Sequence, residues 1–341
     1  MKLSQIINSR EKFTMGFIGG SITEGGNNEY FIGLIKEKFI AECPETQITC
    51  VNAGVGGTNS ALGLFRLERD LMSKNPDIVF IEFAVNDYNL ATSGIYIENM
   101  IRSVIKRNVP VVLIHTANGD ILREYEKGEI PSNIKKYTEL SEYYNILQIN
   151  MGYELFKALG MTADDFMREN FLDSCHPNST GYKRYADIII KGIENYDFNM
   201  NEIDKPYLFG REISNPRLVL CEGLANDSWK LSYNTMYERL PNYIYSFTPG
   251  DELVFDFEGS FLGIYYTVEK DSGIIEYCID DGEWKECSLW DKYALHFGRA
   301  HFLILEEELE NKLHTLKIRI SHKKDEKSEG HYARLGAFVV G

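Results

Sequence analysis

Five short strand-like segments, separated by segments with helical spacing, constrain the fold of the first half of this chain. Each has the length of a single strand, and the segment 78–81 is apolar throughout, as in strands that are buried on both faces of a sheet. Strands that alternate with helices predict a three-layer α/β/α domain with a parallel sheet. The predicted strands cover residues 13–18, 47–52, 78–81, 111–114 and 145–149, and the predicted helices cover 30–40, 61–73, 95–107, 134–144, 153–159 and 179–196.

The pattern changes after about residue 200, where helical periodicity fades and period-two alternation begins. The sequence Asp280-Asp281-Gly282 separates two alternating segments and is typical of a hairpin turn. Several short strands at this spacing predict a β-sandwich. We therefore expect a first domain over residues 1–205 and a β-sandwich domain over 206–341. The clearest alternating segments are 253–257, 263–268, 274–279 and 316–320.

The first strand leads into a serine in the stretch Phe13–Glu24. Gly19 and Gly20 end the apolar run, and Ser21 follows them directly. This layout places a hydroxyl at the carboxyl edge of a parallel sheet, where ligands bind and helix N-termini stabilise negative charge. Serine is also a common helix N-cap, so the turn alone does not establish chemistry.

An acid and a base lie far downstream, in the loop 173–178 that precedes the last helix of the first domain. A serine nucleophile needs a base to take its proton and a third group to orient that base. Asp173 and His176, three residues apart, are of the right types for these two roles.

Two more strands end in turns that could stabilise an oxyanion. The glycine-rich turn 53–60 lacks the lysine of a phosphate-binding loop, so presenting a backbone N–H is its more plausible chemical use, with a plain tight turn as the alternative. Asn86 follows the third strand and can donate its side-chain N–H₂, although an Asn-Asp pair is also common in ordinary turns.

Four segments together resemble the signature blocks of one family. FIGGSITEG, NAGVGGTNS, FAVND and DSCHPN occur in the order found in the SGNH hydrolases, the GDSL-type esterase and lipase superfamily, whose catalytic domain is flavodoxin-like. The resemblance covers roughly residues 13–195. It implies Ser21 as nucleophile, His176 as base and Asp173 as the orienting acid. It also implies an oxyanion hole made by Ser21 N–H, Gly57 N–H and the Asn86 side chain, with no metal and no cofactor.

The chain departs from the family pattern at Gly20, where the family usually has aspartate. That aspartate has no catalytic role, so the difference concerns the geometry of the loop and substrate preference. Cys175 lies between the acid and the base, but Ser21 already has the surroundings of a nucleophile, so we do not expect a cysteine nucleophile.

Charge and cysteine usage exclude several classes of function. A formal net charge of −15 over 341 residues argues against nucleic acid or an anionic membrane as partner. The six cysteines are scattered without a C-x-x-C pair, which favours neither a disulfide framework nor a zinc site. The N-terminal residues do not resemble a signal peptide and no apolar run is long enough to span a membrane, so we expect a cytoplasmic protein.

Some residues have both a functional and a structural interpretation. His115 ends the fourth strand and is a candidate for substrate contact, but such a histidine is more often simply hydrogen-bonded in place. Trp229, Trp284 and Trp290 could stack on sugar rings or fill the core of the second domain.

Appended sandwich domains in this superfamily favour carbohydrate substrates, so the resemblance implies an esterase that removes a small acyl group, such as acetyl, from a sugar. One alternative is a lipase or thioesterase that acts on longer acyl chains. Another is a non-catalytic carbohydrate-binding protein, although such a protein has no need of nucleophile, base, acid and oxyanion donors together. The partner we expect is a small or saccharide ester; the sugar, the acyl group and the oligomeric state are not determined by the sequence.

Overall fold

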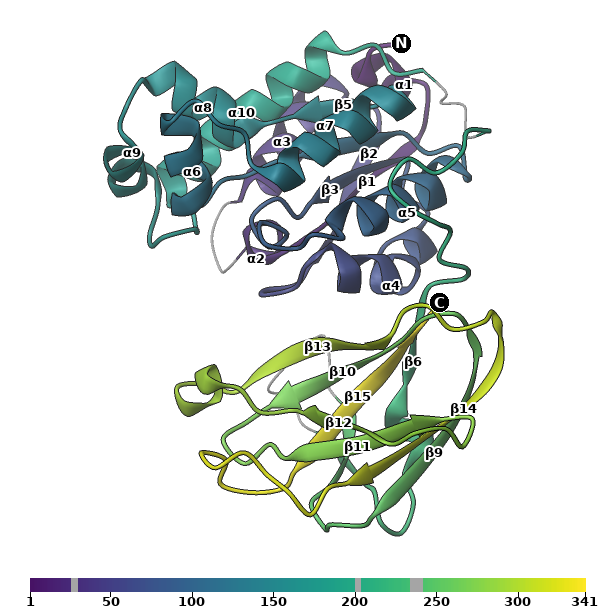
Figure 1. Cartoon of the computed structure of the whole chain (residues 1–341). Coiled ribbons are helices and arrows are strands. Elements are labelled where there is room, and N and C mark those ends of the chain that lie inside the picture. Colours follow the sequence, from purple (N-terminus) through teal and green to yellow (C-terminus); the bar gives the residue numbers. More distant parts are fainter. Residues whose placement is uncertain (26–29, 200–203, 234–241) are drawn as a thin grey trace. The chain divides into compact units, whose positions relative to one another are not determined.

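The computed structural model describes residues 1–25, 30–199, 204–233 and 242–341. The chain forms two compact units, Met1–Glu212 and Ile213–Gly341. Figure 1 shows the helices in the first unit and a strand-rich second unit.

The N-terminal unit is built on a parallel sheet with the strand order β2-β1-β3-β4-β5 among the described residues. This is the flavodoxin-like order, which places a ligand site where the order reverses, between β1 and β3. The predicted parallel sheet is confirmed, and each predicted strand is found to within a few residues. The strands are β1 (Lys12–Gly19), β2 (Gln47–Gly54), β3 (Ile78–Glu82), β4 (Val111–Ile114) and β5 (Leu147–Ile149).

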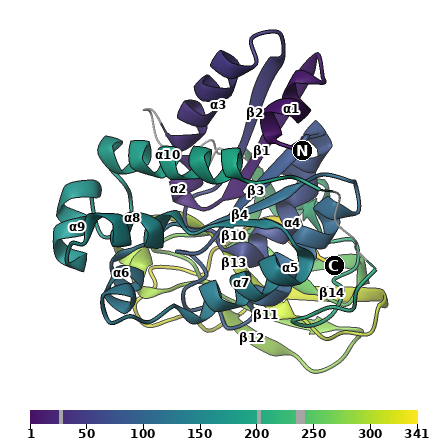
Figure 2. The same cartoon turned by 90° about the horizontal axis from the view of Figure 1, so that it is seen from above.

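Helices cover both faces of this sheet, as Figure 2 shows from above. Helices α3 and α10 pack together on one face, and α4, α5 and α7 lie on the other. Asparagine side chains cap several helices; Asn59 accepts from the Leu62 N–H and Asn178 accepts from the Gly181 N–H. Helices α1, α6 and α9 lie outside the predicted segments. The helices are α1 (Leu3–Asn8), α2 (Ser21–Glu24), α3 (Phe31–Glu42), α4 (Ser60–Asp70), α5 (Ser93–Ile105), α6 (Gly119–Glu126), α7 (Ser132–Tyr144), α8 (Met151–Leu159), α9 (Ala163–Asn170) and α10 (Ser179–Asn195).

The centre of the sheet holds the core of this unit. Phe17 of β1 and Phe80 of β3 stack with ring centroids 4.5 Å apart, and both are fully buried. The parallel register pairs Gly19 with Glu82, so these two strands end side by side. The segments that carry Ser21 and Asn86 therefore leave the sheet at neighbouring points.

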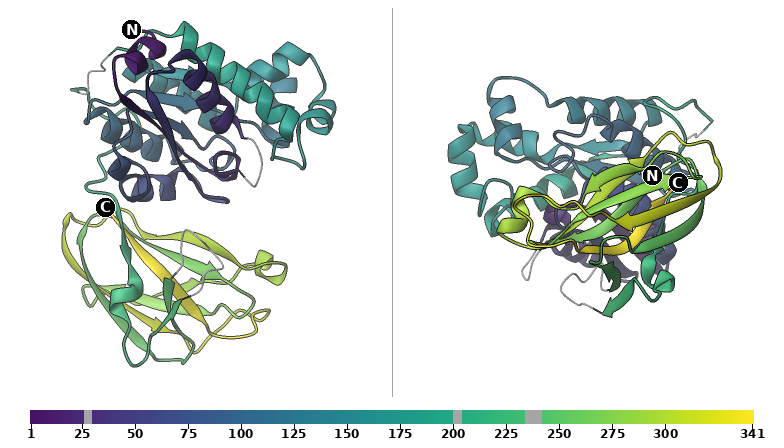
Figure 3. Two further views of the ribbon diagram at one scale, coloured as in Figure 1. Left: turned by 180° about the vertical axis from the view of Figure 1, so that it is seen from behind. Right: turned by 60° about the horizontal axis from the view of Figure 1, so that its bottom comes forward.

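The C-terminal unit contains two antiparallel sheets in its described residues, which confirms the predicted β-sandwich. Figure 3 shows these strands from two further sides. One sheet has the order β13-β10-β15-β8-β7, with β6 also paired to β15, and the other has the order β12-β11-β14-β9. The strands are β6 (Arg217–Leu220), β7 (Lys230–Tyr233), β8 (Asn242–Ser246), β9 (Glu252–Gly259), β10 (Leu262–Val268), β11 (Ile274–Ile279), β12 (Lys285–Ser288), β13 (Arg299–Glu306), β14 (Lys312–Ile320) and β15 (Ala333–Val340).

The two sheets share one apolar core. Phe255 of β9 stacks on Phe338 of β15, with ring centroids 4.2 Å apart. The predicted hairpin is present between β11 and β12. Asp280 and Asp281 take φ values of 52° and 56° there, as a tight hairpin turn requires.

The three tryptophans differ in their surroundings. Trp229 is 0% exposed and belongs to the core, whereas Trp290 is half-buried and packs against that core. Trp284 is half-buried beneath the Arg319 guanidinium, 4.0 Å from its ring centroid. Tyr293 and Phe297 are more open, at 52% and 55% exposure.

In the described parts of the chain, no helix combines the length and the apolar character needed to cross a membrane.

Candidate active site

Ser21, His176 and Asp173 form one continuous hydrogen-bonded chain. The Ser21 Oγ lies 2.8 Å from His176 Nε2, and His176 Nδ1 lies 2.7 Å from Asp173 Oδ2. Ser21 is the first residue of α2, while the other two residues lie in the loop between α9 and α10. This is the arrangement in which a base can take the serine proton while an acid holds the base in place.

The carboxylate of Asp173 is held at both oxygens. Its Oδ1 accepts the backbone N–H groups of Cys175 and His176, each at 2.8 Å, and its Oδ2 faces the histidine ring. Partial burial alone would raise the pKa of Asp173, but these hydrogen bonds outweigh it and lower the pKa to about 2. Asp173 is therefore ionised at neutral pH and oriented toward His176.

Backbone pairing closes the loop that carries this acid and base. The Leu172 N–H donates to the His176 carbonyl at 2.8 Å, and the Asn178 N–H donates to the Asn170 carbonyl at 2.8 Å. Asn178 then caps α10. These contacts hold a tight loop in which the side chains of Asp173 and His176 can form a hydrogen bond.

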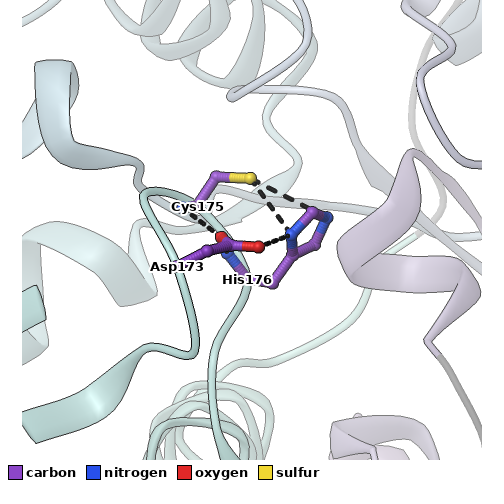
Figure 4. A group of neighbouring side chains, drawn as sticks. All are labelled: Asp173, Cys175 and His176. Atoms are coloured by element: carbon purple, nitrogen blue, oxygen red, sulfur yellow. Dashed lines mark hydrogen bonds and ion pairs between the residues drawn. The ribbon is translucent and has the colours of Figure 1, made fainter. Parts of the chain in front are cut away.

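Cys175 packs against the histidine ring (Figure 4). Its Sγ lies 3.3 Å from Nδ1 and 3.7 Å from Nε2 of His176. Burial, together with the nearby Asp173 charge, raises the pKa of this thiol to about 11, so it stays protonated at neutral pH. The donor atoms of Asp173, Cys175 and His176 lie within 4.8 Å of one another and could hold a metal ion. A metal on His176 would compete with the hydrogen bonds that link it to Ser21 and Asp173.

Two backbone N–H groups near Ser21 can act as oxyanion donors. Ser21 itself begins a helix, so its N–H has no partner within that helix. Gly57 has a φ of 69°, is exposed, and its N–H has no hydrogen-bond partner among the described residues. The preceding Gly56 N–H instead donates to Glu24 Oε2 at 2.8 Å. Of these two glycines, Gly57 therefore keeps its donor available.

Asn86 lies against the residue that precedes Ser21. A Cβ atom built on Gly20 would lie only 1.9 Å from Asn86 Oδ1. Any side chain at position 20, including the aspartate usual in the family, would overlap the Asn86 amide as it stands here. The glycine thus allows the amide to approach the nucleophile turn.

Buried polar groups hold the Asn86 loop. Asp87, 0% exposed, accepts the Ser60 N–H at 2.9 Å and the Tyr137 hydroxyl. Asn133 donates to the Ala84 carbonyl at 2.7 Å. Burial raises the pKa of Asp87 to about 6, although its hydrogen bonds offset part of that rise.

His115 occupies a buried position. It is 1% exposed, and its ring centroid lies 5.3 Å from that of Tyr137. Burial lowers its pKa to about 3, so the ring is neutral. Substrate contact by His115 stays a prediction, and burial of the side chain does not favour it.

Glu82, at the end of β3, was not among the predicted site residues. Its carboxyl group accepts the Thr23 hydroxyl at 3.0 Å and the Thr116 hydroxyl at 2.7 Å, with 1% exposure. Burial raises the pKa of Glu82 to about 7. The sequence could have indicated Glu82, because it is an acid that ends an otherwise apolar strand at the ligand-binding edge of the sheet.

A hollow of about 520 Å³ lies beside the Asp173 loop. It is walled by α6 and α9, two helices that the sequence analysis did not predict. Asp120 and Arg123 come from α6, while Leu172, 77% exposed, comes from the loop. The signal for α6 was Asn118 as its cap, since Asn118 accepts the Ile121 N–H at 2.9 Å. The residues that line the hollow are Asn118, Gly119, Asp120, Arg123, Met167, Arg168, Phe171, Leu172, Asp173 and Ser174.

Two of the solved structures that match all or part of this chain are esterases. One is a two-domain esterase active on acetylated mannans, co-crystallised with mannopentaose; it is 20% identical, with a TM-score of 0.79 over 98% of this chain and 92% of that chain. Another is a mutant of an acetylxylan esterase from Geobacillus stearothermophilus, 18% identical, with a TM-score of 0.46 over 54% of this chain and 95% of that chain. At such identity the first likeness shows a shared fold of both units. No curated protein sequence matches the chain.

The family comparison concerns the N-terminal unit. Residues 17–184 match the GDSL-like Lipase/Acylhydrolase family. The matched region begins in β1, contains Ser21 and both predicted oxyanion turns, and extends through the Asp173 loop into α10. Over these residues, the N-terminal unit is similar to the GDSL-like lipase/acylhydrolase family.

Proposed function

We propose that this protein is a serine esterase that removes a small acyl group, most favourably acetyl, from a saccharide. The observation that carries the proposal is the hydrogen-bonded chain Ser21–His176–Asp173, with distances of 2.8 Å and 2.7 Å. The family match and the fold shared with an esterase active on acetylated mannans support the choice of chemistry and of substrate class.

In the acylation step, His176 Nε2 takes the proton of Ser21 while Oγ attacks the ester carbonyl carbon. Asp173 keeps the proton on Nδ1, which leaves the lone pair on Nε2 free to act as base. The tetrahedral intermediate then collapses. His176 returns its proton to the sugar oxygen, the bond from that oxygen to the acyl carbon breaks, and the acyl group remains on Ser21.

The negative oxygen of the intermediate needs donors that are already in place. We assign these to the N–H groups of Ser21 and Gly57 and to the Asn86 side chain. Gly57 N–H has no competing partner among the described residues, and the Asn86 amide lies against Gly20. Each such donor is worth on the order of 3 kcal/mol in the transition state.

Deacylation repeats the same steps with water. His176 takes a proton from the attacking water, and the second tetrahedral intermediate releases the acid when Ser21 recovers its proton. The residues of the chain supply every proton transfer in this cycle.

We assign the hollow beside the Asp173 loop to the saccharide. A volume of about 520 Å³ lies within the range of about 300–1,000 Å³ that is typical of small-molecule sites. Asp120 and Arg123 offer planar polar groups for sugar hydroxyls, while Leu172 and Met167 offer apolar surface. Asp173 forms part of its wall, so a sugar held there would remain close to the triad.

A series of p-nitrophenyl esters of increasing acyl length tests the chemistry. We expect acetate to be turned over fastest and Ser21→Ala to abolish turnover. We expect a nearly unchanged melting temperature for Ser21→Ala, because the hydroxyl is only half-buried and lies outside the apolar core. Faster turnover of long esters would favour a lipase or thioesterase. A wild-type protein that turns over none of the esters, or a Ser21→Ala variant that retains activity, would contradict the proposal.

A second experiment tests the saccharide site. Arg123→Ala should raise KM for acetylated manno-oligosaccharides and leave p-nitrophenyl acetate kinetics unchanged, since the small ester does not reach the hollow. Arg107→Ala is the matched control. Arg107 precedes β4 at the opposite edge of the sheet, is 47% exposed against 50% for Arg123, and is likewise paired with a carboxylate. Equal effects of the two variants on the oligosaccharides would contradict the assignment.

A further inference from the structure

Arg66, in the middle of α4, is a buried cation that points beneath the two turns of the active site. Its side chain is 1% exposed. One guanidinium nitrogen donates to the Gly19 carbonyl at 2.8 Å, and the other donates to the Ala53 carbonyl. A single side chain therefore joins two backbone segments that are far apart in the sequence.

The two carbonyls belong to neighbouring strands at the ligand-binding edge. Gly19 is the last residue of β1 and Ala53 is the penultimate residue of β2, where the parallel register pairs it with Ile18. Ser21 follows two residues after the first carbonyl. The turn that ends at Gly57 follows the second. Arg66 thus spans the segment that carries the nucleophile and the segment that carries the proposed oxyanion donor.

Stability alone does not call for an arginine at this place. Desolvating a guanidinium is costly, and an apolar side chain of similar volume is often as stabilising as a buried ion pair. Asp70 Oδ2 lies 3.4 Å from the guanidinium and is largely buried, whereas the shorter hydrogen bonds go to the neutral Gly19 and Ala53 carbonyls. What only arginine supplies is a rigid planar fork that reaches two acceptors at once.

We propose that Arg66 is a positioning residue that sets the spacing between Ser21 and the Gly57 N–H. The attacking oxygen and the oxyanion donor must be held to within about 0.5 Å for catalysis. The Val55 N–H already donates to the Gly19 carbonyl at 3.0 Å, and the guanidinium adds a side-chain bond to each of the two strand ends. This inference rests on the proposed esterase function.

The glycines on either side explain why a positioning residue acts here. Gly19 and Gly54 meet the α2 segment closely, with a built Cβ 2.2 Å from Thr23 Oγ1 and 2.1 Å from the Glu24 N atom, respectively. Gly19 and Gly54 have no side chains with which to connect the strand ends, and the Asn52 amide of β2 donates to the Thr23 and Glu24 carbonyls of α2 instead. The Arg66 fork adds a second side-chain connection, from α4.

The test compares Arg66→Lys and Arg66→Met with Arg69→Lys and Arg69→Met. Arg69 lies on the same helix, is 36% exposed, and its guanidinium donates to both carboxylate oxygens of Asp70. We expect the Arg66 variants to lower kcat for p-nitrophenyl acetate about 10- to 100-fold with KM within twofold, because a small misplacement of the reacting groups costs up to about 100-fold. The Arg69 variants should match the wild type.

A double-mutant cycle separates positioning from loss of folded protein. In the Asn86→Ala background, where the oxyanion site is already impaired, the effect of Arg66→Lys on kcat should shrink. A general structural defect would lower kcat by the same factor in both backgrounds. If Arg66→Met does not fold, the Arg66→Lys variant and this cycle still test the positioning role of Arg66.

The possible failures are distinguishable. If Arg66→Lys is folded and keeps kcat within twofold of a wild type whose activity depends on Ser21, this inference is overturned and the esterase proposal stands. An equal factor in both backgrounds also overturns it. If the wild type hydrolyses no ester, the proposed function fails and this inference fails with it.

Discussion

The residues proposed to carry the chemistry are exposed or half-buried, whereas the residues that hold them are buried. The side chains of Asp173 and His176 are 53% and 38% exposed. In contrast, Arg66 and Glu82 are each 1% exposed and Asp87 is 0% exposed. The exposed pair lies on one loop, while the buried charges lie on or after elements of the sheet and on α4.

This difference indicates that activity and stability respond to different residues. An exposed loop closed by its own hydrogen bonds can change chemically without disturbing the core. A buried charge cannot be removed in the same way, since its partners would lose their hydrogen bonds inside the protein. Variants of the exposed group should therefore change kcat alone, and variants of the buried group should change stability as well.

Among variants that keep Ser21, the largest effect is expected from Asp173→Asn. The asparagine Oδ1 should keep the two backbone N–H groups of Cys175 and His176, which turns its NH₂ toward His176 Nδ1. His176 would then carry its proton on Nε2 and could not accept one from Ser21. We expect kcat to fall on the order of 10⁴-fold with a small change in melting temperature. Ester kinetics measure kcat, and thermal unfolding measures the melting temperature. A melting temperature far below that of the wild type would contradict the statement that variants of the exposed residues leave stability unchanged.

A smaller loss is expected when the oxyanion site is changed. Asn86→Ala should lower kcat by about 100- to 1,000-fold with a smaller change in KM, because its hydrogen bond strengthens in the transition state. An effect confined to KM would make Asn86 a substrate-binding residue instead.

Gly20→Ala should produce much of the same loss, because its Cβ would occupy the place of Asn86 Oδ1. Gly33→Ala is the control, since a Cβ there meets no atom within 4 Å. In the Asn86→Ala background, Gly20→Ala should lower kcat little further. A full additional loss in that background would show that Gly20 acts by another route.

The buried carboxyl group of Glu82 should make the free energy of unfolding depend on pH. Because burial raises the pKa of Glu82 from 4.5 to about 7, the folded state binds its proton more tightly than the unfolded state does. The free energy of unfolding should therefore fall as pH rises from about 4.5 to about 7, by on the order of 3 kcal/mol from this group.

Glu82→Gln should remove this part of the pH dependence, whereas Gln at the exposed Glu37 should not. Denaturant unfolding of the three proteins at pH 5 and pH 8 measures the difference. Identical pH dependence in wild type and Glu82→Gln would mean that Glu82 does not titrate in this range.

The smallest expected effect concerns the end of the first domain. The boundary after residue 205 stays a prediction. The buried carboxylate of Glu98 accepts the Leu208 N–H at 2.6 Å and the Phe209 N–H at 2.8 Å. A chain that ends at Lys205 would lose both bonds, whereas a chain that ends at Glu212 would keep them.

We expect the shorter chain to be less stable by about 1–3 kcal/mol, the cost of leaving a buried acceptor unpaired. Thermal unfolding compares the two chains. Activity on an acetylated saccharide then tests whether the β-sandwich takes part in catalysis: full activity of the chain ending at Glu212 would mean that it does not. Equal stability of the two chains would contradict the role of Glu98.

Much of the fold could be predicted because its signals are local. The strands β1, β3 and β4 are compact apolar runs, and period-two alternation marked β9, β10, β11 and β14. Helices α6 and α9 were missed because each is short and their apolar residues are interrupted by charge. Strands β6 and β7, of four residues each, are also too short to show clear alternation.

The sequence by itself determined which residue types could do the chemistry, since a serine after a strand, an acid and a base three residues apart, and a glycine turn are all local patterns. Only the tertiary structure decided which distant groups meet. The contact of Arg66 with Gly19 and Ala53, and the approach of Asn86 to Gly20, join residues separated by many positions. No local pattern specifies such contacts, because they depend on strand order and on how a helix packs over two strand ends.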